Sequence, residues 1–239
     1  MGRYKGGQVD AFIFDLDGTL IDSGLDIAMS ANFTRVHFGL GEIPVPTAVG
    51  YVGDGVAQLL WRVLGHDLRS GLTEAAGLPV NENMHAEAMG VFADHYGRHL
   101  LDHTALYPGV RDVLARYRRI PMFLATNKPR RFTDPILQGL HLAEAFTGIV
   151  AGDETPARKP DPVHLGRCLE GHDFDVARVV VVGDSPNDIL AARSLGAIAV
   201  GCTYGLTAPG LIRSANPNFL LGEISELAAL FPSRKDLAS

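Results

Sequence analysis

Two aspartates stand at the end of a short apolar stretch near the start of the chain. Residues 11–14 read Ala-Phe-Ile-Phe, and Asp15 and Asp17 follow, with Gly18 directly after them. Neighbouring carboxylates are costly to bury unless a cation, a shared proton or hydrogen bonds compensate them. The stretch therefore predicts either a polar strand end that caps the next helix or a site where two acids act together.

Later segments favour a chemical site. Thr126 and Asp184 each end a further apolar run, and Lys159 lies in the loop region between them. Asp188 follows Asp184 by one helical turn, a spacing that places two side chains on one face of a helix. If the apolar runs are parallel strands, their carboxyl ends meet at one edge of the sheet, where ligands bind in such folds. We therefore expect these side chains to meet in one cleft.

The expected side chains suit a divalent cation and a phosphorylated substrate. Mg²⁺ takes a few carboxylates together with waters and a substrate oxygen, and a lysine ammonium group suits a phosphate. A carboxylate such as Asp15 can act as a nucleophile in phosphoryl transfer. Asp17 is the natural candidate for the group that protonates the leaving oxygen and later activates water. Thr126 and the amides beside it can hold the phosphoryl oxygens.

The elements that must position these groups alternate in type. Apolar runs typical of buried strands occur at 11–14, 121–125, 146–150, 179–182, 197–200 and 219–221. Helical patterns occur at 110–118, 132–139, 161–170, 187–195 and 224–231. Alternation of this kind predicts parallel strands with right-handed crossovers. The fold class is therefore α/β, with a Rossmann-like doubly wound parallel sheet.

An all-helical insert is predicted between the first strand and the rest. Helical patterns occur at 25–38, 56–64, 72–76 and 82–100, and Pro44 and Pro46 predict an irregular stretch between the first two. No segment of this region reads as a strand. The chain is therefore expected to form a core domain of residues 1–22 and 102–239 and a helical domain of residues 23–101.

Two patterns within the insert have alternative interpretations. Gly53 and Asp54 form either a plain helix start or a loop that closes over the substrate. His95, His99 and His103 recur every four residues, which favours a stripe along one helix face over a metal site.

The composition is that of an ordinary enzyme-like globular protein. The chain has 239 residues, 46% of them hydrophobic, and a net charge of -6, which argues against a nucleic-acid or anionic-membrane surface. No apolar run approaches the roughly 18 residues that a membrane span needs. Cys168 and Cys202 are expected to be free thiols in a reducing compartment. These features predict a cytoplasmic monomer or homodimer that acts on a small metabolite.

Four segments resemble the ordered motifs of the haloacid dehalogenase superfamily. They read Asp-Leu-Asp-Gly-Thr-Leu at 15–20, Thr-Asn at 126–127, Lys-Pro at 159–160, and Gly-Asp-Ser-Pro-Asn-Asp at 183–188. The insert is similar to the helical cap of that superfamily. The segments 51–56, 126–129 and 203–205 resemble its phosphoglycolate phosphatases most.

The resemblance implies a Mg²⁺-dependent phosphatase that forms an aspartyl phosphate, with 2-phosphoglycolate as the best candidate substrate. It makes Asp15 the nucleophile and Asp17 the general acid and base. The Mg²⁺ ligands that it implies are Asp15, the main-chain carbonyl of Asp17, and Asp184. The phosphate-binding residues that it implies are Thr126, Asn127 and Lys159, with Asp188 in support.

Other members of the superfamily provide alternatives. Dehalogenases lack the second acid, so Asp17 disfavours dehalogenation. The imine chemistry of phosphonoacetaldehyde hydrolases uses a cap lysine, and residues 23–101 contain no lysine. Phosphoglucomutase-type transfer within a sugar phosphate and a non-catalytic phosphate-binding role remain as alternatives.

Overall fold

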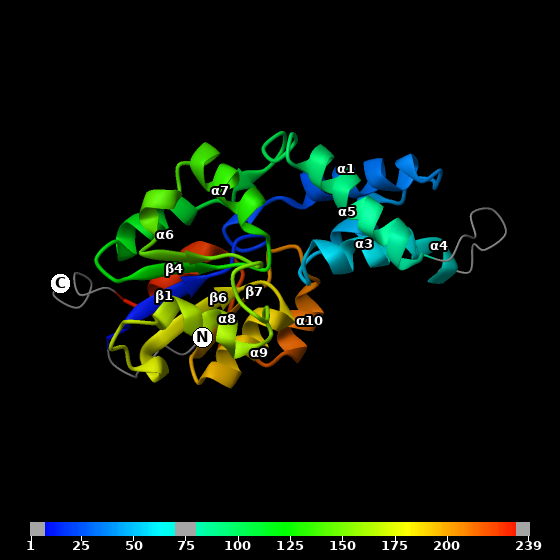
Figure 1. Ribbon diagram of the computed structural model, residues 1–239. Coiled ribbons are helices and arrows are strands. Elements are labelled where there is room, and N and C mark those ends of the chain that lie inside the picture. The colour runs from blue at the N-terminus through cyan, green and yellow to red at the C-terminus, as the bar shows by residue number, and fades with distance from the viewer. Residues whose placement is uncertain (1–7, 70–79, 233–239) are drawn as a thin grey trace. The chain divides into compact units, whose positions relative to one another are not determined.

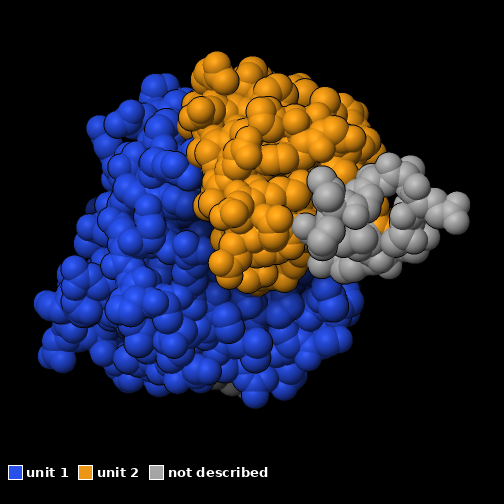
Figure 2. Space-filling model, turned by 45° about the vertical axis from the view of Figure 1, so that its right-hand side comes forward, with its two compact units in different colours: residues 1–22, 105–239 blue, residues 23–104 orange. Residues whose placement is uncertain are grey.

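The computed structural model describes residues 8–69 and 80–232. The chain divides into two compact units, Met1–Asp22 with Ala105–Ser239, and Ser23–Thr104 (Figure 1, Figure 2). We call the first the core unit and the second the helical unit. The helical unit contains the whole predicted insert, residues 23–101.

A six-stranded parallel sheet forms the centre of the core unit. Its strands are β1 (Ala11–Phe14), β4 (Met122–Ala125), β5 (Gly148–Val150), β6 (Val179–Gly183), β7 (Ile198–Cys202) and β8 (Phe219–Leu221). They are arranged in the order β5-β4-β1-β6-β7-β8, and every neighbouring pair is parallel. The sheet confirms the predicted α/β fold class, and it places the first strand of the chain at its centre.

The central strand β1 is buried on both faces, which explains its uninterrupted apolar sequence. Ala11 and Ile13 point to one side and pack with residues of the helices that cover it. Phe12 points to the other side, where its ring centroid lies 4.5 Å from that of Tyr117 and 6.0 Å from that of Phe231. The period of two along a strand therefore divides four apolar residues between two cores.

Helices cover both faces of the sheet. The helices of the core unit include α6 (Val110–Tyr117), α7 (Arg130–Gly139), α8 (Pro162–Leu169), α9 (Pro186–Leu195), α10 (Pro209–Ser214) and α11 (Leu227–Leu230). Figure 1 shows α6 and α7 on one side of the sheet and α8 and α9 on the other. The helix predicted at 224–231 is instead a 3₁₀ turn, Ile224–Glu226, followed by the short α11.

A small antiparallel ribbon lies where the chain leaves and re-enters the core unit. It pairs β2 (Ile21–Asp22) with β3 (Ala105–Leu106). The sequence did not predict it, because a two-residue strand is too short to show alternation.

The helical unit consists of α1 (Gly24–His37), α2 (Val45–Val49), α3 (Val56–Leu64), α4 (His66–Arg69) and α5 (Glu82–Tyr96) in its described part. The helix predicted at 72–76 lies outside the described residues. The irregular stretch predicted around Pro44 and Pro46 is wrong, since α2 begins directly after Pro44. Pro46 is the second residue of that helix, where an N–H would have no intrahelical partner, so proline is tolerated.

The predicted histidine stripe is present only in part. Helix α5 ends at Tyr96, so His99 and His103 lie beyond it. The ring of His99 still stacks on that of His95, with 4.4 Å between their centroids, but His103 does not continue the stripe. His103 instead places its Nδ1 atom 2.8 Å from Oδ1 of Asp26 on α1. In the described part of the chain, no helix is both long and apolar enough to cross a membrane.

Candidate active site

The carboxyl ends of adjacent strands carry the polar residues singled out from the sequence. Asp15 follows β1, Thr126 follows β4, and Asp184 follows β6, while Lys159 lies in the loop after β5. In the sheet, β4 and β5 lie on one side of β1, while β6, β7 and β8 lie on the other. The order of the strands therefore reverses direction at β1. This switch in strand order is where open parallel sheets bind ligands.

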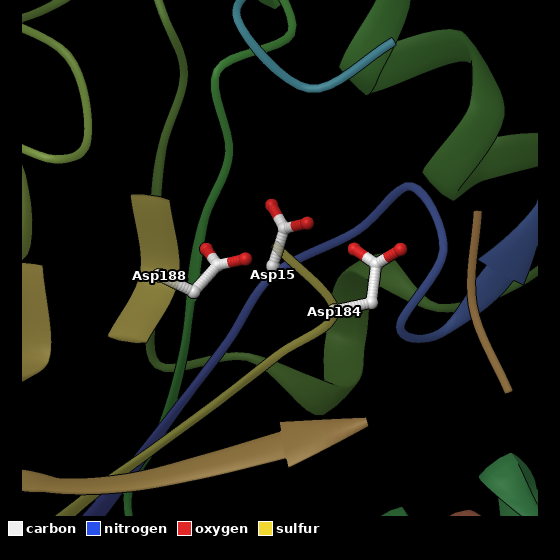
Figure 3. Close-up of side chains that lie close together, drawn as sticks. All are labelled: Asp15, Asp184 and Asp188. Carbon is white, nitrogen blue, oxygen red and sulfur yellow. The ribbon is translucent and has the colours of Figure 1, made fainter. Parts of the chain in front are cut away.

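Three carboxylates meet at this edge. Oxygen atoms of Asp15, Asp184 and Asp188 all lie within 4.8 Å of one another, and Figure 3 shows the side chains gathered in one place. The three residues are at most 8% exposed. Such a group requires compensation, because burial and mutual repulsion both disfavour the charged forms.

Lys159 provides part of that compensation. Its ammonium group donates to Oδ1 of Asp15 at 2.7 Å, to Oδ1 of Asp188 at 2.6 Å and to the carbonyl of Ala125 at 2.6 Å. These three bonds use all the donors of a lysine. Burial lowers the pKa of Lys159, but Asp15 and Asp188 raise it by more, so its pKa lies above the usual value and the group stays charged.

The two metal-ligand candidates have perturbed pKa values. The pKa of Asp15 is raised to about 7. Burial raises this pKa most and repulsion from Asp188 raises it further, while the attraction of Lys159 lowers it by less than the two together. The pKa of Asp184 is also raised, first by burial and then by repulsion from Asp15 and Asp188. A bound cation would reverse both shifts, since an opposite charge favours the ionised form.

The surroundings of Asp184 are built tightly around its carboxylate. Its Oδ2 atom accepts hydrogen bonds from the backbone N–H groups of Leu206 at 2.7 Å and Thr207 at 3.2 Å. A Cβ atom on Gly18 would lie 2.1 Å from the same oxygen, and one on Gly205 would lie 2.4 Å from it. Only glycine fits at these two positions, so the backbone itself forms the wall beside the carboxylate.

Asp188 has both of its oxygens committed within the protein. Oδ1 accepts from Lys159, while Oδ2 accepts from the backbone N–H of Ser185 at 3.0 Å and from its hydroxyl at 2.6 Å. The bond from the Ser185 N–H is one half of the capping box that begins α9, and in the other half the N–H of Asp188 donates to Oγ of Ser185 at 3.4 Å. This helix start therefore fixes a carboxylate that orients the lysine.

A second lysine, which the sequence analysis missed, lies beside Asp17. The Nζ atom of Lys128 is 3.2 Å from Oδ1 of Asp17, and the lysine side chain is 5% exposed. The backbone N–H of Lys128 also donates to Oγ1 of Thr126 at 3.1 Å. The position of a lysine directly after the Thr-Asn motif was the available signal, but its partner depends on how two distant loops meet.

Asn127, expected to bind phosphate, directs its side chain at a neighbouring loop. Its Oδ1 accepts from the backbone N–H of Lys159 at 3.1 Å, and its Nδ2 donates to the carbonyl of the same residue at 3.0 Å. The remaining predicted pair lies in the helical unit, where Asp54 forms an ion pair with Arg62 of α3 and Gly53 has a φ of 123°. A loop-closing role for that pair stays a prediction.

The charges and donor atoms of the site suit a divalent cation. The carboxylates of Asp15, Asp17, Asp184 and Asp188 outnumber the ammonium groups of Lys128 and Lys159 by two. One divalent cation would balance the difference. The donors are all oxygen atoms, which hard cations prefer. The residues present therefore fit a divalent metal.

Comparisons with known proteins agree with this arrangement. Residues 9–196 match the model of the family described as haloacid dehalogenase-like hydrolase. A phosphoglycolate phosphatase of Chromobacterium violaceum is 37% identical over 208 residues, which cover 83% of this chain and 86% of the relative. A phosphoglycolate phosphatase of Vibrio parahaemolyticus is 35% identical over 224 residues, covering 92% and 95%.

A solved structure supports the same assignment. The crystal structure of a protein described as a predicted phosphoglycolate phosphatase, from Haemophilus somnus, has a TM-score of 0.86 and 26% sequence identity. The match covers 94% of this chain and 98% of that one. The chain is thus an enzyme that belongs to the haloacid dehalogenase-like hydrolases.

Proposed function

We propose that this hydrolase is a Mg²⁺-dependent phosphatase of small anionic phosphomonoesters, with 2-phosphoglycolate as the preferred substrate. The observation that carries the proposal is the placement of Asp15, whose carboxylate lies 2.7 Å from a lysine and beside two further buried acids. The relatives named phosphoglycolate phosphatase support the substrate. They do not favour the mutase-type alternative.

In the first step, an oxygen of Asp15 attacks the phosphorus atom of the substrate. The bond from phosphorus to the leaving oxygen breaks, and its electron pair goes to that oxygen, which takes a proton from Asp17. The phosphoryl group is then an aspartyl phosphate on Asp15. Asp17 lies two residues after the nucleophile, beside Lys128, on the loop that leaves the central strand.

In the second step, Asp17 acts as the base. It takes a proton from a water molecule, whose oxygen attacks phosphorus, and the carboxylate of Asp15 leaves with the electron pair of the broken bond. Inorganic phosphate is released and both aspartates return to their initial states. One residue thus supplies the acid of the first step and the base of the second.

The remaining groups neutralise and hold the phosphoryl oxygens. Asp15, Asp184 and the main-chain carbonyl of Asp17 are the residues that would hold Mg²⁺. Bound there, the metal supplies positive charge that lets an anionic nucleophile and an anionic phosphate approach each other. Thr126 provides a hydroxyl and Lys159 a positive charge beside the same edge.

The proposal is tested with a panel of phosphorylated metabolites, assayed for free phosphate and for isomer formation. We expect phosphate release from 2-phosphoglycolate that requires Mg²⁺ and stops with a chelator. An Asp15→Asn variant should fold and lose more than about 10³-fold in kcat, because an amide cannot replace the nucleophile. Undiminished hydrolysis in metal-stripped buffer, isomer formation without phosphate release, or normal turnover by the variant would contradict the proposal.

A further inference from the structure

Asn127 bonds to the main chain of Lys159 at both ends of its side-chain amide. The acceptor Oδ1 lies 3.1 Å from the Lys159 nitrogen, and the donor Nδ2 lies 3.0 Å from the Lys159 oxygen. Asn127 is 6% exposed and Lys159 is 4% exposed. A buried pair of this kind is costly to break, because it leaves a donor and an acceptor without partners.

The loop that carries Lys159 is held against the end of β4 at further points. The backbone N–H of Gly152 donates to the carbonyl of Lys128 at 2.9 Å, and a Cβ atom on Gly152 would lie 2.2 Å from the carbonyl oxygen of Asn127. On α8, the fully buried His164 places its Nε2 atom 3.1 Å from the carbonyl oxygen of Thr126. The carbonyl can only accept, so this nitrogen carries a proton. The two segments thus form one fixed assembly.

The position of the Lys159 main chain decides what its ammonium group can reach. That group donates to Asp15, Asp188 and the carbonyl of Ala125 at distances of 2.6 to 2.7 Å. All three acceptors belong to other segments, so they stay in place if the lysine loop moves. A shift of the loop therefore lengthens these bonds and moves the positive charge away from the nucleophile.

We propose that Asn127 is a positioning residue that acts on the reaction through Lys159. Its side chain fixes the main chain from which the lysine extends, and so sets the distance from the ammonium group to Asp15. This inference rests on the proposed phosphatase function and assigns Asn127 a different task from direct phosphate binding by its side chain. The two roles differ in whether the effect of Asn127 depends on the presence of the lysine.

A double-mutant cycle separates these roles. It uses Asn127→Ala, Lys159→Met and the double variant, with kcat/KM for 2-phosphoglycolate as the readout. We expect Asn127→Ala alone to lose about 10- to 100-fold, as supporting residues of active sites do. In the Lys159→Met background the same change should cost less than about 2-fold, because the group it positions is gone. Equal losses in both backgrounds, or normal activity of Asn127→Ala, would overturn the inference.

The helical unit offers a matched control. Asn32 makes the same pair of hydrogen bonds with the main chain of Ile43. Its Oδ1 accepts from the Ile43 N–H at 3.0 Å, and its Nδ2 donates to the Ile43 carbonyl at 2.8 Å. Asn32 is 7% exposed. An Asn32→Ala variant removes an equivalent buried pair within the other unit. It should lower the melting temperature as Asn127→Ala does, and it should keep kcat/KM within about 2-fold of the parent protein. A loss of activity equal to that of Asn127→Ala would show that lost stability alone explains the effect.

A structural readout keeps the test decisive if activity cannot be measured. The exchange of the Lys159 amide hydrogen with deuterium should speed up at least tenfold in Asn127→Ser, a milder variant that serves if the alanine variant does not fold. Unchanged exchange would overturn the link between the two residues. If the parent protein hydrolyses no phosphomonoester, the proposed function fails while this readout still tests the contact.

Discussion

Lys159 and Asp15 lie 144 positions apart in the chain and 2.7 Å apart in the structure. The contact joins the loop after β5 to the end of the central strand β1, across β4, which lies between these two strands. It keeps the positive charge of Lys159 against the carboxylate of Asp15, the residue proposed as the nucleophile. The chemistry of the site therefore depends on the register of strands that are distant in sequence.

Replacing Asp17 should separate the two chemical steps. An Asp17→Asn variant can neither protonate a leaving alkoxide nor activate water, so turnover of 2-phosphoglycolate should fall by about 10²- to 10⁴-fold. With p-nitrophenyl phosphate, whose leaving group needs no proton, the first step should persist and the second should stall. Rapid mixing should show one equivalent of p-nitrophenol released as a burst. A steady rate without a burst would contradict the assignment of Asp17.

Replacing Gly18 should impair the site by collision. A methyl group there would lie 2.1 Å from Oδ2 of Asp184, and the residue has a φ of 82°. Gly39 is the control, because its φ of 71° is similar and no atom lies within 4 Å of a built Cβ. Gly39→Ala should cost about 1 kcal/mol of unfolding free energy and leave activity intact. Gly18→Ala should also lose at least about 10²-fold in kcat/KM. Equal activities of the two variants would refute the claim that a Cβ atom at position 18 displaces the Asp184 carboxylate.

The stability of the protein should depend on pH through His164. Burial lowers its pKa to about 4 from an ordinary value of 6.5, and repulsion from Lys159 adds to the shift. Below pH 6.5 the histidine of the unfolded chain therefore binds a proton, whereas His164 of the folded protein binds it only near pH 4. The stabilising contribution is complete above pH 6.5 and declines by about 3 kcal/mol as the pH falls from 6.5 to 4.

The measurement for His164 is a comparison of unfolding curves. Urea unfolding of the parent protein and of His164→Gln between pH 4 and pH 8 isolates the histidine, since other groups titrate in both. The difference in unfolding free energy should be largest above pH 6.5 and should shrink toward pH 4. A difference that is constant with pH would show that the ring titrates equally in both states.

Asp26 should stabilise the helical unit at neutral pH. Burial raises its pKa, but hydrogen bonds from the side chain and backbone of Thr104 and from His103 outweigh burial, so the pKa is lowered. Its contribution is present above the unfolded pKa and disappears as the pH falls through the lower folded value. Asp26→Asn should cost about 2 kcal/mol at pH 7, in line with hydrogen bonds to a charged group. Differential scanning calorimetry should show a smaller difference in unfolding free energy between the parent protein and Asp26→Asn at pH 3 than at pH 7. An equal difference at both pH values would contradict a lowered pKa of Asp26.

The sequence predicted the parts of this molecule that depend on local pattern. Apolar runs that end in Asp15, Thr126 and Asp184 marked the parallel strands and the edge where ligands bind. Local pattern failed for α2, because Pro46 stands in a first turn where proline is harmless, and for the end of α5 at Tyr96.

Relations between distant loops were beyond the sequence. The pairing of Lys128 with Asp17 and the two bonds from Asn127 to Lys159 depend on how loops from different strands pack. The sequence motifs indicate that a lysine and an asparagine lie near the site, but which groups they contact depends on how the loops at the edge of the sheet pack.

The central position of β1 also has a consequence for how the protein is made. Its two neighbours are β4, which begins at Met122, and β6, which begins at Val179. At about 5 to 20 residues per second, the ribosome needs at least about 5 s after β1 to complete β4. The whole of Ser23–Thr104 is translated in that interval. The nascent chain must therefore hold an apolar segment unpaired while the inserted helices emerge, and apolar segments exposed in this way are prone to aggregation.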